Sequence, residues 1–308
     1  MIPPRIASGL GAVAAIAALS LPSAATAAKK PPAQGKKAAP QFYVSLGDSY
    51  ASGYQPPAAG AAAGNTREGF VYQVPALAAR RGWKLNVVNF ACGGATTTSI
   101  LQQKDCPKEA LGPGARGYGG KTQIQAAEAF LKRNRKKVGL VTVSIGGNDV
   151  TFCATQPDPV GCVSLAQPKL LRNVTTLTRR LRKAAGPKVR IVGTTYPDVI
   201  LGTWLLGTDS GRNLARLSVF AFERSINPAL KGAYEGVGGR FVDVTAATGA
   251  YTPLDQTVDV PALGGTVPIA VAKVCDLTWF CAARDIHARK SGYALIADLV
   301  ARTLPKRK

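Results

Sequence analysis

Short apolar runs of strand length alternate with longer stretches of helical period along most of this chain. The runs are rich in β-branched and aromatic side chains, as buried parallel strands are. They cover residues 42–46, 85–90, 138–145, 189–194 and 240–244. Apolar residues recur every three or four positions over residues 70–81, 123–135, 169–185, 214–234 and 291–304. This alternation predicts an α/β protein of three layers, in which helices cover both faces of a central, mostly parallel five-stranded sheet.

Three segments do not fit the alternation and are interpreted as insertions. They are residues 102–120, 151–167 and 246–284, and each contains or borders a pair of cysteines. A disulfide that closes a long loop restricts the unfolded chain, and loops at the rim of a sheet are where sites are usually built. We therefore expect disulfide-closed loops near the functional site.

The six cysteines form three local couples, and we predict that each couple is a disulfide. The couples are Cys92 with Cys106, Cys153 with Cys162, and Cys275 with Cys281. Other connectivities remain formally open. A zinc site needs closer cysteine spacing or several histidines, whereas the tightest couple here has five residues between its members and the chain has one histidine. We therefore expect no metal site.

The first 40 residues differ in composition from the rest. Residues 1–27 carry Arg5, an apolar stretch over residues 10–21 and a final Ala-Thr-Ala, the pattern of a removable export signal. An uncleaved anchor is the alternative, but the stretch is shorter than the roughly 20 residues that span a bilayer. Residues 28–40 are predicted to be a flexible basic leader. Residues 41–308 then form one folded domain of a secreted, extracellular protein.

The chain is strongly basic, with 39 Lys and Arg against 17 Asp and Glu, for a net charge of +22. The first 40 residues hold five cations and no acid, so the remainder keeps +17 of this charge. Zinc-finger spacing, an RNP-like aromatic stretch and a recognition helix are lacking, so we expect no specific nucleic acid. For an exported protein, the charge favours an anionic cell-wall polymer, a lipid surface or an acidic polysaccharide; charge that only maintains solubility is the alternative.

Residues suited to acyl transfer follow the first three predicted strands. Ser49 follows the first, Gly94 the second and Asn148 the third. Ligands bind at the carboxyl ends of strands in open α/β sheets. A serine hydroxyl can serve there as a nucleophile, and a backbone N–H or a side-chain amide can stabilise an oxyanion. Taken alone, Asp48 and Ser49 also fit a helix cap, and the other two segments fit ordinary turns.

His287, the one histidine in the chain, lies just before the last predicted helix. A serine nucleophile needs a base that takes its proton, and His287 is the one imidazole available for that role. A structural or exposed histidine is the alternative where nothing else points to chemistry. Here Ser49, Gly94 and Asn148, after the first three predicted strands, do point to acyl-transfer chemistry.

Four short blocks resemble those of the SGNH, or GDSL, hydrolase family of esterases and lipases, and they stand in the family's order. The blocks are Gly47-Asp48-Ser49-Tyr50, residues 89–95 (Asn-Phe-Ala-Cys-Gly-Gly-Ala), Gly146-Gly147-Asn148-Asp149 and Asp285-Ile286-His287. The cysteine layout is similar to that of the actinobacterial extracellular branch. The resemblance implies a flavodoxin-like α/β/α catalytic domain over residues 41–308.

The resemblance also implies a role for each block. Ser49 corresponds to the nucleophile and His287 to the general base, which then acts as general acid. The backbone N–H groups of Ser49 and Gly94 and the side chain of Asn148 correspond to the oxyanion hole.

The acid that orients the histidine is less regular in this chain. In the family it stands three positions before the histidine, where this chain has Arg284. Asp285 or a backbone carbonyl of residues 279–283 are the candidates for that role, and Asp285 also fits a plain helix cap.

The resemblance implies a secreted serine esterase or lipase that cleaves carboxylic esters through an acyl-serine intermediate, as a monomer and without a cofactor. An acetyl esterase that acts on polysaccharide is the alternative, and a non-catalytic basic protein that binds surfaces is a third reading. Trp204, Leu205 and Leu206, after the fourth predicted strand, fit either an acyl pocket or ordinary core.

Overall fold

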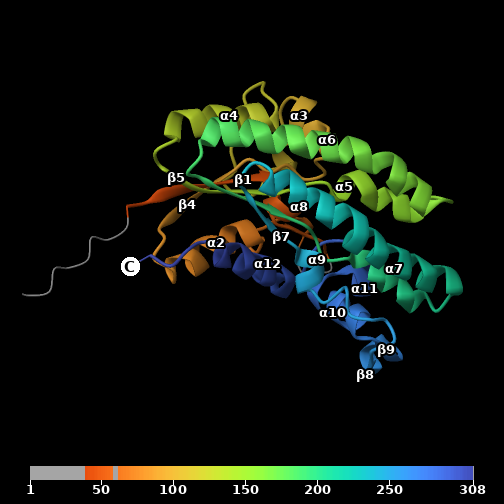
Figure 1. Ribbon diagram of the computed structural model, residues 1–308. Coiled ribbons are helices and arrows are strands. Elements are labelled where there is room, and N and C mark those ends of the chain that lie inside the picture. The colour runs from red at the N-terminus through yellow and green to blue at the C-terminus, as the bar shows by residue number, and fades with distance from the viewer. Residues whose placement is uncertain (1–38, 58–61, 308) are drawn as a thin grey trace, which may run out of the picture. The chain divides into compact units, whose positions relative to one another are not determined.

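A computed structural model describes residues 39–57 and 62–307 of the chain (Figure 1). The predicted export signal, residues 1–27, lies outside the described residues, as does the predicted leader up to residue 38. No helix within the described ranges is both long and apolar enough to cross a membrane.

Five strands form one central sheet in the order β4-β1-β5-β6-β7, and every neighbouring pair is parallel. The strands are β1 (Gln41–Gly47), β4 (Leu85–Asn89), β5 (Val138–Ser144), β6 (Arg190–Thr194) and β7 (Arg240–Val242). Each lies on one of the predicted apolar runs. The central strand β5 is buried along its whole length, as expected of a parallel strand covered on both faces. The predicted α/β fold is confirmed.

Helices cover both faces of the sheet and enclose two apolar cores (Figure 1). One face is covered by α2 (Phe70–Ala79) and α12 (Lys290–Arg302), and the other by α4 (Gln123–Asn134), α6 (Pro159–Ala185) and α8 (Asn227–Glu235). The helices turn an apolar stripe toward the sheet, and each fully buried Leu or Val stabilises the fold by about 1.5–3 kcal/mol. In α6 the stripe includes Leu170, Val174, Leu177 and Leu181.

Two predicted helices differ from those in the structure. The predicted start at residue 169 is wrong, because α6 begins at Pro159, within the segment predicted as an insertion, and continues through Pro168. The predicted helix 214–234 is also wrong as one unit. It is α7 (Asp209–Ala221), a π-helical turn (Phe222–Ile226) and α8 in succession.

The remaining elements are short and lie mostly in the connections. Small helices are α1 (Ser49–Ser52), α3 (Ser99–Gln102), α5 (Gly147–Val150), α9 (Val244–Ala247), α10 (Ile269–Leu277) and α11 (Phe280–Ala283). Two antiparallel pairs join β2 (Tyr54–Gln55) to β3 (Gly64–Asn65) and β8 (Thr257–Val260) to β9 (Gly265–Pro268). Turns of 3₁₀ helix cover Lys108–Ala110, Thr151–Thr155, Val199–Leu206 and Pro261–Leu263.

The chain reverses its direction across the sheet at β1. From β1 it passes to β4 on one side and then returns to β5 on the other, which leaves a crevice at the carboxyl ends of β1 and β5. Gly47 ends β1 with φ +138°, and a Cβ there would lie 2.1 Å from the Ser144 carbonyl oxygen. Only glycine fits this approach of β1 to β5.

The structure pairs the six cysteines in the predicted way. The disulfides are Cys92–Cys106, Cys153–Cys162 and Cys275–Cys281. Each has at least one member in a segment predicted as an insertion. These covalent links hold the long connections near the carboxyl edge of the sheet.

Candidate active site

Ser49 begins the short helix α1 directly after β1. The Asp48 carboxylate caps this helix by accepting a hydrogen bond from the Tyr50 N–H at 3.0 Å. Gly47 before it is fixed on both sides, because the Gln123 amide accepts from its N–H at 2.7 Å and donates to its carbonyl at 3.1 Å. The Ser49 side chain is thereby presented at the crevice, where the residue keeps 8% of its surface exposed.

His287 lies 238 positions further along the chain, in the connection between α11 and α12, yet it meets Ser49 in space. Its Nε2 atom is 2.8 Å from Ser49 Oγ. The ring of Tyr54 lies against the imidazole, with centroids 4.4 Å apart. The Tyr50 hydroxyl donates to the carbonyl of Ile286 at 2.6 Å, which ties the connection to α1.

Asp285 stands on the other side of the imidazole. Its Oδ1 atom is 2.7 Å from His287 Nδ1 and also accepts from the His287 backbone N–H at 2.9 Å. Burial alone raises the pKa of Asp285, but the hydrogen bonds and charge of His287 outweigh it, so the pKa is lowered. Of the candidates left open by the sequence, the structure thus brings Asp285 to His287.

A left-handed residue accounts for the unusual spacing of this acid. Arg284 has φ +55° and ends α11, so that the chain turns sharply just before Asp285. The carbonyls of Trp279 and Phe280 accept from N–H groups of their own helical turn, at 2.8 Å each. Those carbonyls are occupied within α11.

Asn148 and Gly94 come from the strand ends on either side of β1. The Asn148 amide donates to the Ala95 carbonyl at 2.9 Å, which joins the turn after β5 to the turn after β4. Gly94 has φ +76°, a left-handed conformation that favours glycine, and open space lies where a Cβ would stand. The same two turns are joined again by Asp149, whose carboxylate accepts from the Thr97 N–H at 2.8 Å and hydroxyl at 2.6 Å.

Tyr196, which follows β6, was not singled out from the sequence. Its hydroxyl donates to Asp48 Oδ2 at 2.5 Å, and its ring packs beside Gly147, where a Cβ would approach the ring to 3.1 Å. Burial raises the pKa of Asp48 to about 7. One sequence signal could have identified Tyr196. It follows the fourth predicted strand and so lies at the same carboxyl edge of the sheet as Ser49, Gly94 and Asn148.

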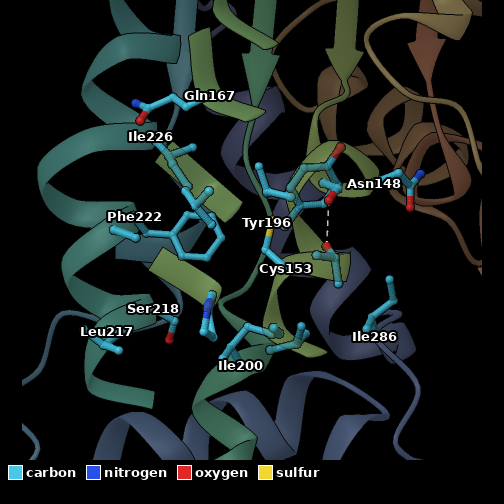
Figure 2. Close-up of a pocket in the computed structure, with 18 of the residues that line it drawn as sticks. Asn148, Cys153, Gln167, Tyr196, Ile200, Leu217, Ser218, Phe222, Ile226 and Ile286 are labelled. Carbon is cyan, nitrogen blue, oxygen red and sulfur yellow. Dashed lines mark hydrogen bonds between the residues drawn. The ribbon is translucent and has the colours of Figure 1, made fainter. Parts of the chain in front are cut away.

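A cavity of about 280 Å³ opens beside Ser49 and has mostly apolar walls (Figure 2). Ser49, Asn148 and Tyr196 lie along one part of it. The opposite wall comes from α7 and the π-helical turn, and includes Leu217, Phe222 and Ile226. Residues from the segment 151–167 complete the wall, among them Cys153, Val160, Val163 and Gln167.

Four residues that the sequence analysis singled out do not line this cavity. Trp204, Leu205 and Leu206 do not line it, and instead pack at the edge of a separate apolar cluster or, in the case of Leu206, stay half exposed. Of the two interpretations that the sequence left open, Trp204 and Leu205 fit packing in an apolar cluster, and the neighbouring Ile200 lines the cavity beside Ser49 instead. Gly94 lines a second, smaller cavity of about 160 Å³ next to the Cys92–Cys106 disulfide.

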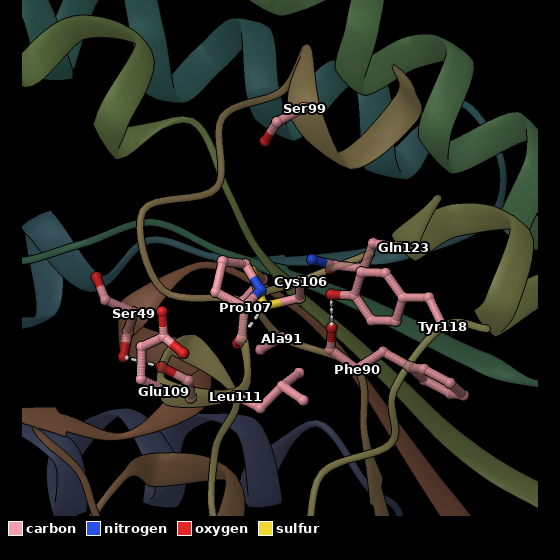
Figure 3. Close-up of a disulfide and its surroundings, with 12 residues drawn as sticks. Ser49, Phe90, Ala91, Ser99, Cys106, Pro107, Glu109, Leu111, Tyr118 and Gln123 are labelled. Atoms are coloured by element: carbon pink, nitrogen blue, oxygen red, sulfur yellow. Dashed lines mark hydrogen bonds between the residues drawn. A yellow bond between two sulfur atoms is a disulfide. The ribbon is translucent and has the colours of Figure 1, made fainter. Parts of the chain in front are cut away.

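Figure 3 shows the Cys92–Cys106 disulfide and its surroundings. The disulfide fixes the turn that carries Gly94, two residues after Cys92. Cys92 N–H donates to the Gly47 carbonyl at 3.0 Å, and Gly93 N–H donates to the Ala110 carbonyl at 2.8 Å. The turn is thus bound to the end of β1 on one side and to the segment closed by the disulfide on the other.

Replacing Cys92 and Cys106 together by serine is expected to destabilise the protein by about 3 kcal/mol, the value for a loop of this length. In the ester hydrolysis that the four sequence blocks imply, turnover should also fall, because Gly94 is then less well fixed. Thermal unfolding and kcat on p-nitrophenyl acetate measure the two effects. The matched control replaces Cys153 and Cys162 by serine and should keep kcat on acetate; if both pairs of substitutions lower kcat equally, the specific link to Gly94 is refuted.

Known proteins resemble this chain in sequence and in fold. Residues 45–295 match the model of the GDSL-like lipase/acylhydrolase family. An extracellular lipase from Streptomyces rimosus has a similar fold, with 20% identity, a TM-score of 0.43 and coverage of 68% of this chain and 82% of that chain. A catalytic variant of an acetylxylan esterase from Geobacillus stearothermophilus shows 15% identity and a TM-score of 0.44 over 85% of this chain and 93% of that one. No curated protein matches the chain.

Proposed function

The chain belongs to the GDSL-like lipase/acylhydrolase family, and from that premise we propose that it hydrolyses carboxylic esters through an acyl intermediate on Ser49. The observation that carries the proposal is the continuous series of hydrogen bonds from Ser49 Oγ through the His287 ring to Asp285, at 2.8 and 2.7 Å. A serine hydroxyl becomes nucleophilic when a base of this kind takes its proton.

In the proposed reaction, Ser49 Oγ attacks the ester carbonyl while His287 Nε2 accepts the hydroxyl proton. The carbonyl oxygen becomes negative in the tetrahedral intermediate. When the intermediate collapses, the bond to the alcohol oxygen breaks and His287 returns the proton to it. Water then attacks the acyl-serine in the same way and releases the carboxylic acid. Asp285 holds the imidazole in the tautomer that leaves Nε2 free to accept.

Three groups are suited to bind the negative oxygen. The backbone N–H of Ser49 opens α1, where the first N–H groups of a helix have no partner inside the helix. Gly94 supplies a second backbone N–H and Asn148 an uncharged amide. A donor of this kind is worth about 3 kcal/mol of transition-state stabilisation, which is why their alignment by Asp149 and the Cys92–Cys106 disulfide matters.

The apolar cavity supports an acyl chain longer than acetyl as the preferred substrate. Leu217, Phe222 and Ile226 offer hydrocarbon contacts and no charge. Each buried methylene contributes about 0.8 kcal/mol, or roughly fourfold in kcat/KM, until the cavity is full. An enzyme that removes only acetyl groups from a polysaccharide gains nothing from such a wall.

A series of p-nitrophenyl esters from acetyl to dodecanoyl tests this preference, with acetylated xylan as the rival substrate. We expect kcat/KM to rise steeply with each added methylene and then to level off. A bulkier side chain in the wall, Leu217→Trp, should move that plateau to a shorter chain, whereas Val258→Trp, at an exposed site in β8, should leave the profile unchanged. Acetate release from xylan without any gain along the ester series would favour the acetyl esterase instead.

We also propose that the protein is secreted and acts extracellularly as a monomer. The three disulfides support this proposal, because disulfides persist in oxidising compartments. The pattern of an export signal over residues 1–27 points the same way.

A further inference from the structure

Tyr196 contacts the residues that flank Ser49, although it comes from another strand. It follows β6, and its hydroxyl donates to Asp48 Oδ2 at 2.5 Å. Its ring meets the ring of Tyr50 edge-on, with centroids 4.9 Å apart, and packs beside Gly147 in the turn after β5. One side chain therefore touches both sequence neighbours of Ser49 and the turn that carries the proposed amide donor.

The Asp48 carboxylate depends on the Tyr196 hydroxyl because few other donors reach it. Asp48 is 2% exposed, so little water reaches its charge, and no Lys, Arg or His of residues 39–57 and 62–307 forms a salt bridge with it. Its oxygens accept from the Tyr50 N–H at 3.0 Å and from the Tyr196 hydroxyl. Burial raises the pKa of Asp48 to about 7, and these hydrogen bonds hold it below the value that burial alone would give.

Three other elements bring ionisable groups toward Asp48. Asp149, from α5, raises the pKa of Asp48 further through like-charge repulsion. Tyr50 and Tyr293, from α1 and α12, are buried phenols whose pKa values are raised well above the usual range, so both stay neutral. His287 lies beyond Tyr50, with ring centroids 5.8 Å apart. The charged form of Asp48 therefore relies on the hydroxyl from the end of β6.

The charge of Asp48 matters because this residue caps α1, the helix that begins with Ser49. A charged acceptor makes a shorter and stronger hydrogen bond with a backbone N–H than a neutral one does. The helix has four residues, so its own hydrogen bonds do little to fix its start. When Asp48 takes up a proton, the cap weakens and the Ser49 hydroxyl is held less firmly against His287.

The end of β6 gives Tyr196 a fixed position for this role. Its backbone carbonyl accepts from the Thr245 hydroxyl at 2.9 Å, and the preceding Thr195 hydroxyl accepts from the Val244 N–H at 2.9 Å. Thr245 and Val244 belong to α9, which follows β7. The backbone of Tyr196 is thereby held by the β6 and β7 end of the sheet rather than by the wall of the cavity.

We propose that Tyr196 is a positioning residue for the nucleophile: its hydroxyl keeps Asp48 charged, and the charged cap holds α1 so that the serine hydroxyl stays aligned with the imidazole. The inference rests on the proposed ester hydrolysis for its effect on rate, but not for its effect on Asp48. Because Tyr196 also lines the cavity (Figure 2), contact with the substrate and plain packing are the two other roles that an experiment must separate.

The test compares Tyr196→Phe with Tyr43→Phe, which each remove one hydrogen-bonded phenolic hydroxyl and keep the ring. Tyr43 lies in β1, and its hydroxyl is bonded to the Thr142 hydroxyl at 2.9 Å rather than to Asp48. The ionisation of Asp48 is followed by ¹³C NMR of protein labelled at the aspartate carboxyl carbon, and its signal is identified by its loss in Asp48→Asn. kcat and KM for p-nitrophenyl acetate are measured from about pH 5 to about pH 9.

We expect Tyr196→Phe to raise the pKa of Asp48 by about one pH unit or more, because the variant lacks a hydrogen bond to the charged form. The acidic limb of kcat should move to higher pH by the same amount. kcat should then fall about fivefold at pH 7 and less than about twofold at pH 9, with KM nearly unchanged. Tyr43→Phe should leave both the pKa of Asp48 and the pH profile of kcat as in the wild type.

Asp48→Asn gives a second readout, because asparagine is a neutral side chain of the same shape. If Tyr196 acts through Asp48, adding Tyr196→Phe to Asp48→Asn should change kcat by less than about twofold, since the two substitutions remove the same effect. Thermal unfolding of each variant near the wild-type temperature shows that it is folded.

Four results would overturn the proposal. They are an unchanged pKa of Asp48 in Tyr196→Phe, a loss of kcat that is equal at every pH, a rise in KM without loss of kcat, and full additivity with Asp48→Asn. An equal loss at every pH would indicate plain packing, and a rise in KM alone would indicate contact with the substrate. A protein that hydrolyses no ester but shows the expected change in the pKa of Asp48 would refute the proposed function and leave the link between Tyr196 and Asp48 standing.

Discussion

Ser49→Ala is expected to reduce kcat on the best p-nitrophenyl ester by at least about 10⁴-fold. The substitution removes the atom proposed to attack the carbonyl, and the proposed oxyanion donors alone would recover only part of the rate. The free energy of unfolding should change little. The substitution removes the hydrogen bond from the hydroxyl to His287, but alanine still places a small side chain at the start of α1. Steady-state kinetics and thermal unfolding, measured on the same preparation, give the two values.

A second serine in the cavity provides the matched control for this experiment. Ser164 lines the same cavity but is exposed and lies on α6, whereas His287 Nε2 is bonded to Ser49. Ser164→Ala should stay within about twofold of the wild-type kcat. A fluorophosphonate should label the wild type and the Ser164 variant at Ser49, with the adduct located by mass spectrometry. Activity that survives Ser49→Ala would refute the acyl-serine mechanism.

His287→Ala should produce a loss of similar size, again at least about 10⁴-fold in kcat. The chain has one histidine, so no other imidazole can take the serine proton or return it to the alcohol. In contrast, Asp285→Ala should cost about 10²- to 10³-fold. Its side chain is 24% exposed, so water can replace part of the hydrogen bond to Nδ1.

Arg284→Asn is the control for the pair, because asparagine tolerates the left-handed conformation at this position. It should keep nearly full activity, although it changes the position where the family usually has its acid. Equal losses in the Asp285 and His287 variants would show that Asp285 is a full member of the catalytic triad. No loss in Asp285→Ala would reduce Asp285 to a cap of the turn before α12.

The sheet could be predicted from the sequence because its strands are buried on both faces. Burial on both faces makes β5 an uninterrupted buried run. Glycine directly follows the runs 42–46 and 138–145 and marks the carboxyl edge there. The lone histidine then limited the choice of base to one residue. Asp285 was less predictable, because its position beside His287 depends on the left-handed turn at Arg284, which no local pattern indicates.

The start of α6 escaped prediction for a physical reason. Its first turns line the cavity beside Ser49 through Val160 and Val163, and only Val163 of these two also packs against the core. The apolar stripe is therefore thin there. A proline is a usual helix boundary, yet α6 continues through Pro168. The role of Tyr196 was hidden for another reason, since its bond to Asp48 joins residues 148 positions apart.

The groups proposed to break the ester and the wall proposed to receive the acyl chain come from different parts of the chain. The former stand on turns after β1, β4 and β5 and before α12, whereas much of the wall belongs to the disulfide-closed segment 151–167 and to α7. Substitutions in segment 151–167 and in α7 can therefore change the preferred acyl chain without changing the proposed catalytic groups. For engineering, a chimera that exchanges segment 151–167 and α7 with those of a relative is the direct way to change acyl selectivity.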